Sequence, residues 1–312
     1  PRDYVSTAPY FWPDPNQPDG LPYIRRDGEV YPGSRTDESD FVRSRTLSRT
    51  VDSLVRAYRK TGEETYAAHA ALLLRTWFIE SATAMNPHLD FAQGIPGVNT
   101  GRRFGIIEGT SLVSALENAG RLVGSPAWTD TDHAALLRWA DAFLDWYLTS
   151  QFGLEEADMH NNHGTHYDVQ VMRLGRMLGR EDLVWAIAEL AKTRRIATQI
   201  EPDGRQPHEL SRTRALSYSA MNLRGMMTIA RMGAKAGSNL WHFETADGRS
   251  IRRALDFLVP YVADPNQPWP YAQITPFDPA DFAPLLREAA VVYDDDSYAV
   301  LADRFVSPPP ES

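Results

Sequence analysis

Beyond residue 40, apolar side chains recur at intervals of three and four residues, which is the spacing of amphipathic helices. Residues 44–60 show this spacing clearly, with apolar positions at Leu47, Val51, Leu54, Val55 and Tyr58. The pair Thr61-Gly62 then interrupts the pattern, which resumes over residues 64–80. Two amphipathic helices separated by a short glycine turn are typical of an antiparallel helical hairpin.

The same arrangement recurs about every fifty to sixty residues, a repetition that indicates a helical array. Further helices are expected at residues 111–123, 130–148, 167–178, 181–195, 217–232 and 251–262. Long polar segments separate the hairpins, and we expect them to gather at one end of the array and to form a cleft. These segments cover residues 82–110, 149–166, 197–215 and 234–250. The pattern therefore predicts an all-α fold.

Residues 1–40 show no helical period and are rich in proline, aspartate, glycine and aromatic residues. We interpret them as an extended arm that packs on the helical body. No stretch inside residues 1–312 has the composition of a linker, so the simplest prediction is a single domain. The chain begins with Pro1 rather than methionine, and we expect a periplasmic or secreted protein whose signal peptide has been removed.

Composition and charge exclude several classes of protein. Of the 312 residues, 43% are hydrophobic, which is ample for a sizeable core. No run of about eighteen apolar residues exists that could cross a membrane. The absence of cysteine excludes disulfides and thiolate chemistry. A net charge of −9 argues against general affinity for nucleic acid, although clustered arginines leave room for a locally basic cleft. We expect neither a nucleic-acid partner nor membrane association.

Two polar segments hold an unusual set of reactive side chains. The first contains Asn162 and His163, and the second contains Arg212 and Tyr218. An amide and a guanidinium can neutralise a carboxylate, while an imidazole and a phenol can move protons. Together these groups suit the removal of a proton next to a carboxylate, followed by expulsion of a neighbouring oxygen. The two segments therefore indicate a lyase that acts on an acidic sugar polymer.

The three histidines His160, His163 and His166 invite a metal-site interpretation. That interpretation is weak, because the usual zinc signature on a helix is His-Glu-x-x-His and no acidic residue lies between these histidines. Alternatively, Asn161 and His166 can cap the helix that follows. We expect neither a metal ion nor another cofactor, since an amide and a guanidinium suffice to neutralise a carboxylate.

Five separated segments carry distinctive motifs. They are APYFWPDP at residues 8–15, NPHLDFAQGIPG at residues 86–97, NTGR at residues 99–102, Asn162-His163, and RTRALSY at residues 212–218. These motifs, in this order, and the helical body between them resemble the alginate lyase family of polysaccharide lyases. The arm and the segment GRRFGIIE at residues 101–108 are closer to the branch that cleaves glucuronan and related β-1,4-uronates.

The resemblance implies an (α/α) toroid or incomplete barrel, which agrees with the hairpin repeats. It also implies β-elimination on β-1,4-linked polyuronates such as glucuronan, cellouronate and mannuronate-rich alginate. Asn162 and one arginine would hold the C5 carboxylate of the sugar in the +1 subsite, with Arg212 favoured over Arg214. Tyr218 would act at the C5 proton and the O4 leaving group. His163 would orient or deprotonate Tyr218, or act as the base itself.

The configuration of the sugar bears on the roles of Tyr218 and His163. In β-D-mannuronate and β-D-glucuronate, the C5 hydrogen and O4 lie on the same side of the ring, so Tyr218 alone can take the proton and return it to the leaving oxygen. In α-L-guluronate they lie on opposite sides, which would make His163 the base and Tyr218 the acid. An ordinary tyrosine pKa of about 10 is high for a base, so a nearby arginine or transfer to His163 must ease proton loss.

Other side chains in the same motifs are candidates for substrate binding, because aromatic faces pack on sugar rings and arginines pair with carboxylates. The candidates are Tyr10, Trp12, His88, Gln93, Asn99, Arg102, Arg103 and Arg214. Tyr10 and Trp12 could equally anchor the arm to the body. An acidic polysaccharide is the expected partner, and no obligatory protein partner is expected.

Two other functions fit the inventory of residues. An inverting glycoside hydrolase on a similar helical toroid would need two carboxylates flanking the bond, and Glu108, Asp168 and Glu209 are available. A non-catalytic protein that binds acidic polysaccharide would need only the binding residues. The sequence leaves open the choice between glucuronate and mannuronate, and between endo and exo action.

Overall fold

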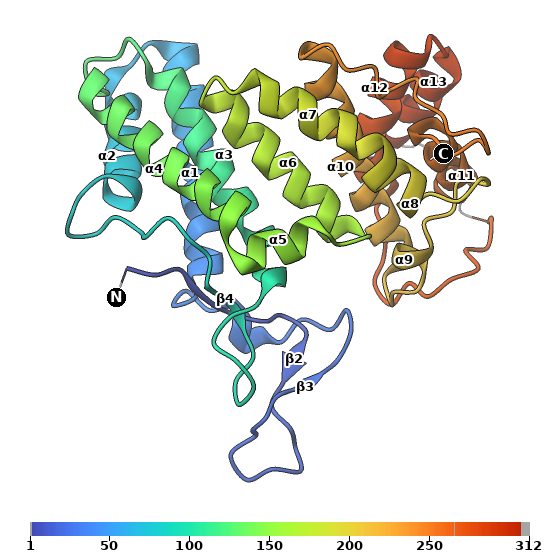
Figure 1. Ribbon diagram of the computed structural model, residues 1–312, viewed down its shortest axis with the longest axis horizontal. Helices are drawn as coiled ribbons and strands as arrows, with labels where there is room; N and C mark the ends of the chain where they lie inside the picture. The colour runs from blue at the N-terminus through green and yellow to red at the C-terminus, as the bar shows by residue number, and fades with distance from the viewer. Residues whose placement is uncertain (1, 265, 307–312) are drawn as a thin grey trace, which may run out of the picture. The chain divides into compact units, whose positions relative to one another are not determined.

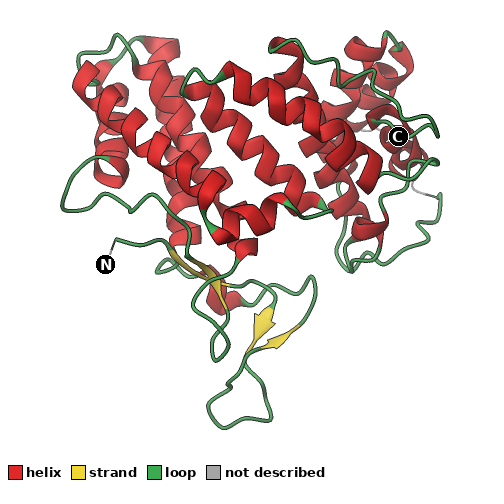
Figure 2. Cartoon of the chain, viewed as in Figure 1, coloured by secondary structure: helices red, strands yellow, loops and turns green. Residues whose placement is uncertain are grey.

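A computed structural model describes residues 2–264 and 266–306, and its regular structure is almost entirely helical (Figure 1). The α-helices are α1 (Asp40–Thr61), α2 (Glu64–Phe78), α3 (Gly109–Ala119), α4 (Asp130–Thr149), α5 (Gln151–Ala157), α6 (Asn162–Met177), α7 (Glu181–Ala191), α8 (Ala197–Gln199), α9 (Pro207–Leu210), α10 (Ala215–Lys235), α11 (Ile251–Ala263), α12 (Ala283–Tyr293) and α13 (Asp296–Val306). This confirms the predicted all-α class (Figure 2).

Shorter elements complete the described chain. The strands are β1 (Val5–Thr7), β2 (Phe11–Trp12), β3 (Ile24–Arg25) and β4 (Phe91–Gly94). The 3-10 helices are η1 (Pro32–Arg35), η2 (Arg103–Glu108), η3 (Gly120–Leu122) and η5 (Pro279–Phe282). A π-helical turn, η4 (Lys192–Ile196), joins α7 to α8.

All the helices predicted from periodicity are present, but some boundaries and elements differ. Helix α6 begins at Asn162, five residues before the predicted start at residue 167. Helix α5 lies inside the polar segment 149–166, for which no helix was predicted. The Ser150 hydroxyl caps this helix by accepting a hydrogen bond from the Gly153 N–H at 3.0 Å. The predictions contained no helix after residue 262, where α12 and α13 form a hairpin.

The chain divides into two compact units. Unit 1 comprises Pro1–Asp158 and Gln170–Glu181, and unit 2 comprises Met159–Val169 and Asp182–Ser312. The expectation that these residues act as a single domain stays a prediction. The two units are described separately below.

In unit 1, α1 packs against α2 and α3, and α2 also contacts α4 (Figure 1). The apolar stripes of these helices meet in a core in which Val51, Val55 and Leu74 have no exposed surface. Gly62 ends α1 in the left-handed conformation, with φ of +74°, and its N–H donates to the Tyr58 carbonyl at 2.7 Å. The first predicted hairpin therefore forms by the expected glycine turn.

The N-terminal arm is extended, as predicted, and short strands tie it to the rest of unit 1. Strand β1 pairs in parallel with β4, and β2 pairs antiparallel with β3. Tyr4 and Ala8, on either side of β1, are buried. The β1–β4 pairing brings the arm against the segment that carries Gln93 and Arg102.

In unit 2, α10 packs against α9 and α11, while η5 contacts α11, α12 and α13. Helix α10 is buried over much of its circumference, including Leu223, Met226 and Ile229, as expected for a central helix. No helix in residues 2–264 and 266–306 is long and apolar enough to cross a lipid bilayer.

Gly101, in the loop between β4 and η2, lies in close contact with the backbone of Asp90. A Cβ atom at this position would lie 1.9 Å from the Asp90 carbonyl oxygen, which belongs to the backbone and cannot rotate away. Gly101→Ala should therefore lower the free energy of unfolding by about 1–3 kcal/mol, the usual cost of overpacking. Urea denaturation measures this change.

Gly120 is the matched control, because a Cβ atom there would meet nothing within 4 Å and its φ is −60°. Gly120→Ala should leave the free energy of unfolding unchanged or raise it by up to about 1 kcal/mol. Equal effects of the two substitutions would contradict the packing described for Gly101.

Candidate active site

The first turn of α6 carries Asn162 and His163, and polar contacts define where this helix begins. The Asn161 Oδ1 atom accepts a hydrogen bond from the His163 N–H at 3.1 Å, so Asn161 caps the helix. The Asn162 N–H donates to Glu209 Oε1 at 2.6 Å. The prediction that Asn162 and His163 lie in a loop is wrong, because these two acceptors satisfy N–H groups that a helix start leaves open.

A buried ion pair fixes the chain just before this turn. Arg195 Nε and Nη2 donate to the two oxygens of Asp168, at 2.7 and 3.0 Å, and both side chains are almost fully buried. Arg195 Nη1 also donates to the Met159 carbonyl at 3.0 Å. Gly164 leaves room for this contact, since a Cβ atom there would lie 2.1 Å from the Met159 oxygen. Asp168 therefore serves to hold Arg195.

Arg212 and Tyr218 are in direct contact. Arg212 lies in the turn after α9, and its Nη2 donates to the Tyr218 hydroxyl at 3.2 Å. The guanidinium carbon lies 4.2 Å from the centre of the Tyr218 ring, a cation–π geometry. Helix α10 starts only at Ala215, so the six-residue spacing between these residues does not have to follow one helical face. A donor at the phenol oxygen stabilises negative charge that develops there when the proton leaves.

Residues 272–274 hold the start of α10, and nothing in the sequence marked them. The Ala215 N–H donates to the Ala272 carbonyl at 2.9 Å. The Gln273 side chain accepts from the Leu216 N–H at 3.0 Å and donates to the Ser217 hydroxyl at 2.8 Å. It therefore satisfies the helix terminus that precedes Tyr218.

Arg214, the alternative carboxylate-binding arginine, immediately precedes α10. Its carbonyl accepts from the Tyr218 N–H at 3.0 Å, and its backbone forms a bridge with Gln273. Within residues 2–264 and 266–306, its buried Nε has no hydrogen-bond partner. The choice between Arg212 and Arg214 stays a prediction.

Glu209 connects the two reactive segments. Its carboxylate accepts from the Asn162 N–H and, at 2.7 Å, from Asn162 Nδ2. Burial raises the pKa of Glu209, whereas these hydrogen bonds and the charges of His163 and Arg212 act to lower it. The structure thus brings Asn162, His163, Arg212 and Tyr218 to one region of unit 2, together with Glu209, which the sequence had offered only to the alternative hydrolase.

The three histidines of the first segment, His160, His163 and His166, are not grouped with further metal-ligating side chains in the part of the chain that the structure describes. The described residues contain no group of three or more histidine, cysteine, aspartate or glutamate side chains suited to hold a metal ion. His166 is partly buried, and burial together with the charge of His163 lowers its pKa to about 4. His166 is therefore neutral at pH 7.

The candidate binding residues Gln93, Arg102 and Arg103 lie close together in unit 1. Arg102 donates to Gln93 Oε1 at 2.8 Å, and its guanidinium lies about 5 Å from the ring centres of Phe11 and Phe104. Burial lowers the pKa of Arg102 to about 10. Arg103 lies over Phe104 and forms a 3.7 Å ion pair with Glu155. These contacts hold two guanidinium groups beside aromatic rings.

Asn99 and His88 have polar partners of their own. Asn99 Oδ1 accepts from the Ile95 N–H at 3.0 Å and so closes a turn. The two ring nitrogens of His88 lie 3.1 Å from Asp3 and 3.3 Å from Asp90. Both side chains therefore have a structural contact beside the predicted role in binding.

Trp12 and Tyr10 belong to the arm. Trp12 Nε1 donates to the Glu29 carbonyl at 3.0 Å, and its ring packs at 5.2 Å on Tyr31 and under Arg26. The Tyr10 carbonyl accepts from the Arg26 N–H. Trp12 therefore packs within the arm, and its side chain remains half-buried.

Glu108 is buried below the arm. Its carboxylate accepts from the Ser6 hydroxyl at 2.6 Å and from the Tyr4 hydroxyl at 3.1 Å, and burial raises its pKa. This environment joins the arm to η2. It offers no open face from which a carboxylate could approach a sugar bond.

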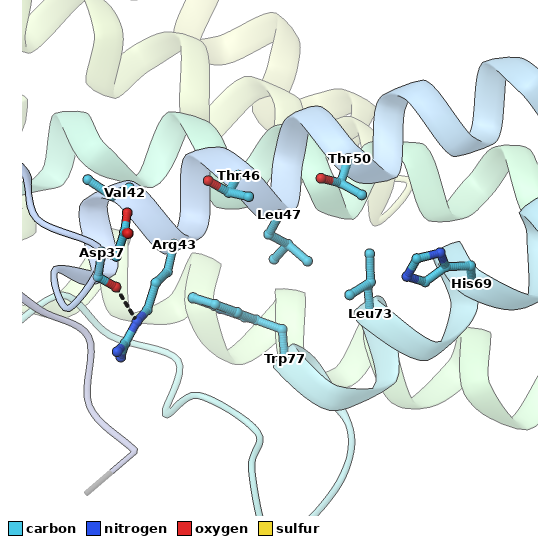
Figure 3. A pocket seen from close by; sticks show the side chains of 9 residues that line it. All are labelled: Asp37, Val42, Arg43, Thr46, Leu47, Thr50, His69, Leu73 and Trp77. Carbon is cyan, nitrogen blue, oxygen red and sulfur yellow. Dashed lines mark hydrogen bonds between the residues drawn. The ribbon is translucent and has the colours of Figure 1, made fainter.

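A pocket of about 400 Å³ lies between α1 and α2 of unit 1 (Figure 3). Leu47, Leu73 and Trp77 are among the apolar residues that line it. None of the predicted site residues lines it. The pocket therefore does not belong to the candidate active site.

A helical body built from hairpins, with an amide, an imidazole, an arginine and a tyrosine in one region, defines a polysaccharide lyase. Residues 1–269 match the family model described as alginate lyase, so the chain belongs to the alginate lyase family. No protein of curated function is significantly similar to the chain.

Solved structures place the fold in the same group. An alginate lyase from Bacteroides ovatus has a TM-score of 0.94 and 36% sequence identity, and the match covers 99% of this chain and 82% of that one. A tetrasaccharide complex of alginate lyase A1-III, with one histidine replaced by alanine, has a TM-score of 0.62 at 17% identity over 98% of this chain and 78% of its own.

A second tetrasaccharide complex of alginate lyase A1-III, with a tyrosine replaced by phenylalanine, has a TM-score of 0.60. It is 16% identical, and the match covers 86% of this chain and 74% of that one. At this identity the two A1-III structures show a shared fold alone. With the Bacteroides structure they confirm the (α/α) fold expected from the motifs.

The lowered pKa of the partly buried His166 should make stability depend on pH. The unfolded side chain binds a proton near pH 6.5 and the folded one only near pH 4. The stabilisation is therefore complete above about pH 6.5 and is lost as the pH falls toward 4, by up to about 3 kcal/mol. His166→Gln should flatten the dependence of the free energy of unfolding on pH between these values, as measured by urea denaturation.

The buried carboxyls of Asp168 and Glu209 have raised pKa values and act in the opposite direction, so only the difference between variant and wild type isolates His166. His69→Gln, at an exposed position, is the control and should leave the slope unchanged. Identical slopes for wild type and His166→Gln would refute the neutral state of His166 in the folded protein.

Proposed function

We propose that this protein cleaves β-1,4-linked polyuronates by β-elimination, with glucuronan, cellouronate and mannuronate-rich alginate as substrates. The contact between Arg212 and the Tyr218 hydroxyl carries the proposal, because it places a cation at a phenol that can exchange a proton with the sugar. Asn162 lies in the same region, linked through Glu209. The similarity to an alginate lyase from Bacteroides ovatus supports the same reaction.

In this mechanism, Asn162 and Arg212 bind the C5 carboxylate of the sugar in the +1 subsite. Their N–H groups stabilise the charge that moves onto the carboxylate when the C5 proton leaves. Arg212 can serve both Tyr218 and the carboxylate, because a guanidinium carries five N–H donors in a planar fork. Arg214 is the alternative partner of the carboxylate.

Tyr218 is the proposed proton carrier. In β-D-glucuronate and β-D-mannuronate, the C5 hydrogen and O4 lie on one face of the ring. The Tyr218 phenolate, stabilised by Arg212, takes the C5 proton as its O–H bond forms, the electron pair makes the C4–C5 double bond, and the C4–O4 bond breaks. The same proton then passes from Tyr218 to the leaving O4 atom. His163 orients Tyr218 or accepts its proton before the reaction.

We propose that the arm and the β4–η2 loop of unit 1 also bind acidic sugars. Arg102 and Arg103 stand beside the rings of Phe11 and Phe104, which combines carboxylate pairing with an aromatic surface for sugar rings. Tyr10, Trp12, His88, Gln93 and Asn99 complete the proposed binding residues.

We further propose a periplasmic or secreted location, because polymeric substrates of this kind are met outside the cytoplasm. The proposal includes neither a nucleic-acid nor an obligatory protein partner. It also needs no metal ion, since Asn162 and arginine neutralise the carboxylate.

The inverting hydrolase is a poorer fit to the observed contacts. Asp168 is engaged by Arg195 through both oxygens, and Glu209 is engaged by Asn162 through both of its own. Glu108 lies in unit 1 among the buried residues beneath the arm. A hydrolase needs one carboxyl to protonate the leaving oxygen and another to activate water, so both must face the substrate.

Incubation of the protein with glucuronan should increase ultraviolet absorbance as the conjugated double bond forms. Tyr218→Phe removes the proton carrier and should lower kcat by roughly 10²–10⁴-fold while leaving polymer affinity close to that of wild type. Tyr58→Phe on α1 is the matched control and should keep wild-type kcat. Saturated products of hydrolysis, or unchanged turnover by Tyr218→Phe, would reject the mechanism.

A panel of defined polymers tests the stereochemical argument. Glucuronan, oxidised cellulose and polymannuronate have the same-side arrangement and should be cleaved, whereas polyguluronate should be cleaved at least about tenfold more slowly because it requires two residues on opposite faces. The relative initial rates on these polymers identify the preferred uronate, and mass analysis shows whether the products carry the unsaturated end. Faster cleavage of polyguluronate would contradict the assignment of Tyr218 as sole proton carrier.

A further inference from the structure

The Glu209 carboxylate accepts two hydrogen bonds from Asn162. Its Oε1 accepts from the backbone N–H at 2.6 Å, and its Oε2 accepts from the side-chain Nδ2 at 2.7 Å. Both residues are about 1% exposed, so water does not compete for these contacts. The carboxylate thus fixes the position of the backbone and the direction of the amide together.

The chemistry of the two groups dictates which way the amide points. A carboxylate offers only acceptors, so Asn162 must turn its nitrogen toward Glu209 and its oxygen away. The Asn162 Oδ1 atom is buried and meets no donor within residues 2–264 and 266–306. The amide therefore presents an acceptor and a second N–H to some group other than Glu209.

We propose that Glu209 is a positioning residue of the elimination reaction, which orients the Asn162 amide toward the C5 carboxylate and a neighbouring hydroxyl of the +1 sugar. The second Nδ2–H donates to the carboxylate, and Oδ1 accepts from the hydroxyl. This inference rests on the proposed lyase function. Glu209 itself touches no part of the substrate and acts through Asn162.

The position of Glu209 at the start of α6 reinforces this role. The N-terminal end of a helix favours a negative charge, and Glu209 binds the first N–H of α6 directly. Movement of this side chain would therefore displace both the helix start and the amide. The Arg212–Tyr218 hydrogen bond does not involve the Glu209 side chain, and Arg212 contacts Glu209 through the backbone carbonyl, which a side-chain substitution retains.

Glu209→Gln is the informative substitution, because it keeps size and shape but replaces one acceptor by a donor. The oxygen of the introduced glutamine can satisfy the backbone N–H of Asn162, and its NH₂ group then faces the Asn162 amide and should reverse it. We expect kcat on glucuronan to fall at least about tenfold with KM changed less than about threefold. A crystal structure of the variant should show the Asn162 amide reversed, with Arg212 and Tyr218 unmoved.

Three comparisons separate positioning from simple loss of structure. In an Asn162→Ala background, Glu209→Gln should lower kcat by less than about twofold, because the residue through which it acts is gone. Glu209→Asp still offers only acceptors and should retain more activity than Glu209→Gln. Glu201→Gln, in the same unit, is the control and should match wild type.

An equal loss of kcat with and without the Asn162 side chain would overturn the proposal, as would a reversed amide with wild-type kcat. If Glu209→Gln does not fold, the same pair of backgrounds is compared with Glu209→Asp, whose smaller deficit should likewise vanish with Asn162→Ala. If the wild-type protein cleaves no polyuronate, the lyase function fails. The crystal structures then still decide whether Glu209 sets the amide direction, and an unreversed amide would reject it.

Discussion

The candidate site depends on one constraint, which is that the first N–H groups of a buried helix must find acceptors outside that helix. At the start of α6, Asn161 and Glu209 supply them. Because Glu209 also binds the Asn162 side chain, one contact both begins the helix and aims the amide. The direction of the Asn162 side chain therefore depends on the same contact that satisfies the first N–H group of α6. In a similar way, Gln273 accepts from an N–H group at the start of α10, the helix that carries Tyr218.

Buried polar contacts, rather than apolar packing, set the details of this region. The Arg195–Asp168 pair illustrates the point, since desolvating two charges costs much of what their attraction returns. The pair instead fixes the position of the chain around Met159, because Arg195 can bind Asp168 and the Met159 carbonyl together in only a few arrangements. Apolar helix faces assemble each unit, and such contacts then decide where individual atoms stand.

Periodicity predicted the helical body well because burial of one helix face leaves a local, repeated signal along the chain. The start of α6 was missed because one of its two acceptors, Glu209, lies far away in sequence. The contact between Arg212 and Tyr218 could not be predicted from helical spacing, because Arg212 precedes α10. Gln273 gave no signal, since a single glutamine in a polar segment has no distinctive pattern. The candidate residues themselves followed from side-chain chemistry and family motifs, while their partners required coordinates.

Arg102 shows how a protein of net negative charge can keep a strong local attraction for anions. Its side chain is held by an amide oxygen and two phenyl rings, none of which carries a negative charge. A guanidinium supported in this way has little rotational freedom left to lose, and an arriving anion does not have to displace any of these three groups. Selectivity for a charged polymer can thus reside in a few immobilised cations, while the remaining acidic surface discourages other polyanions.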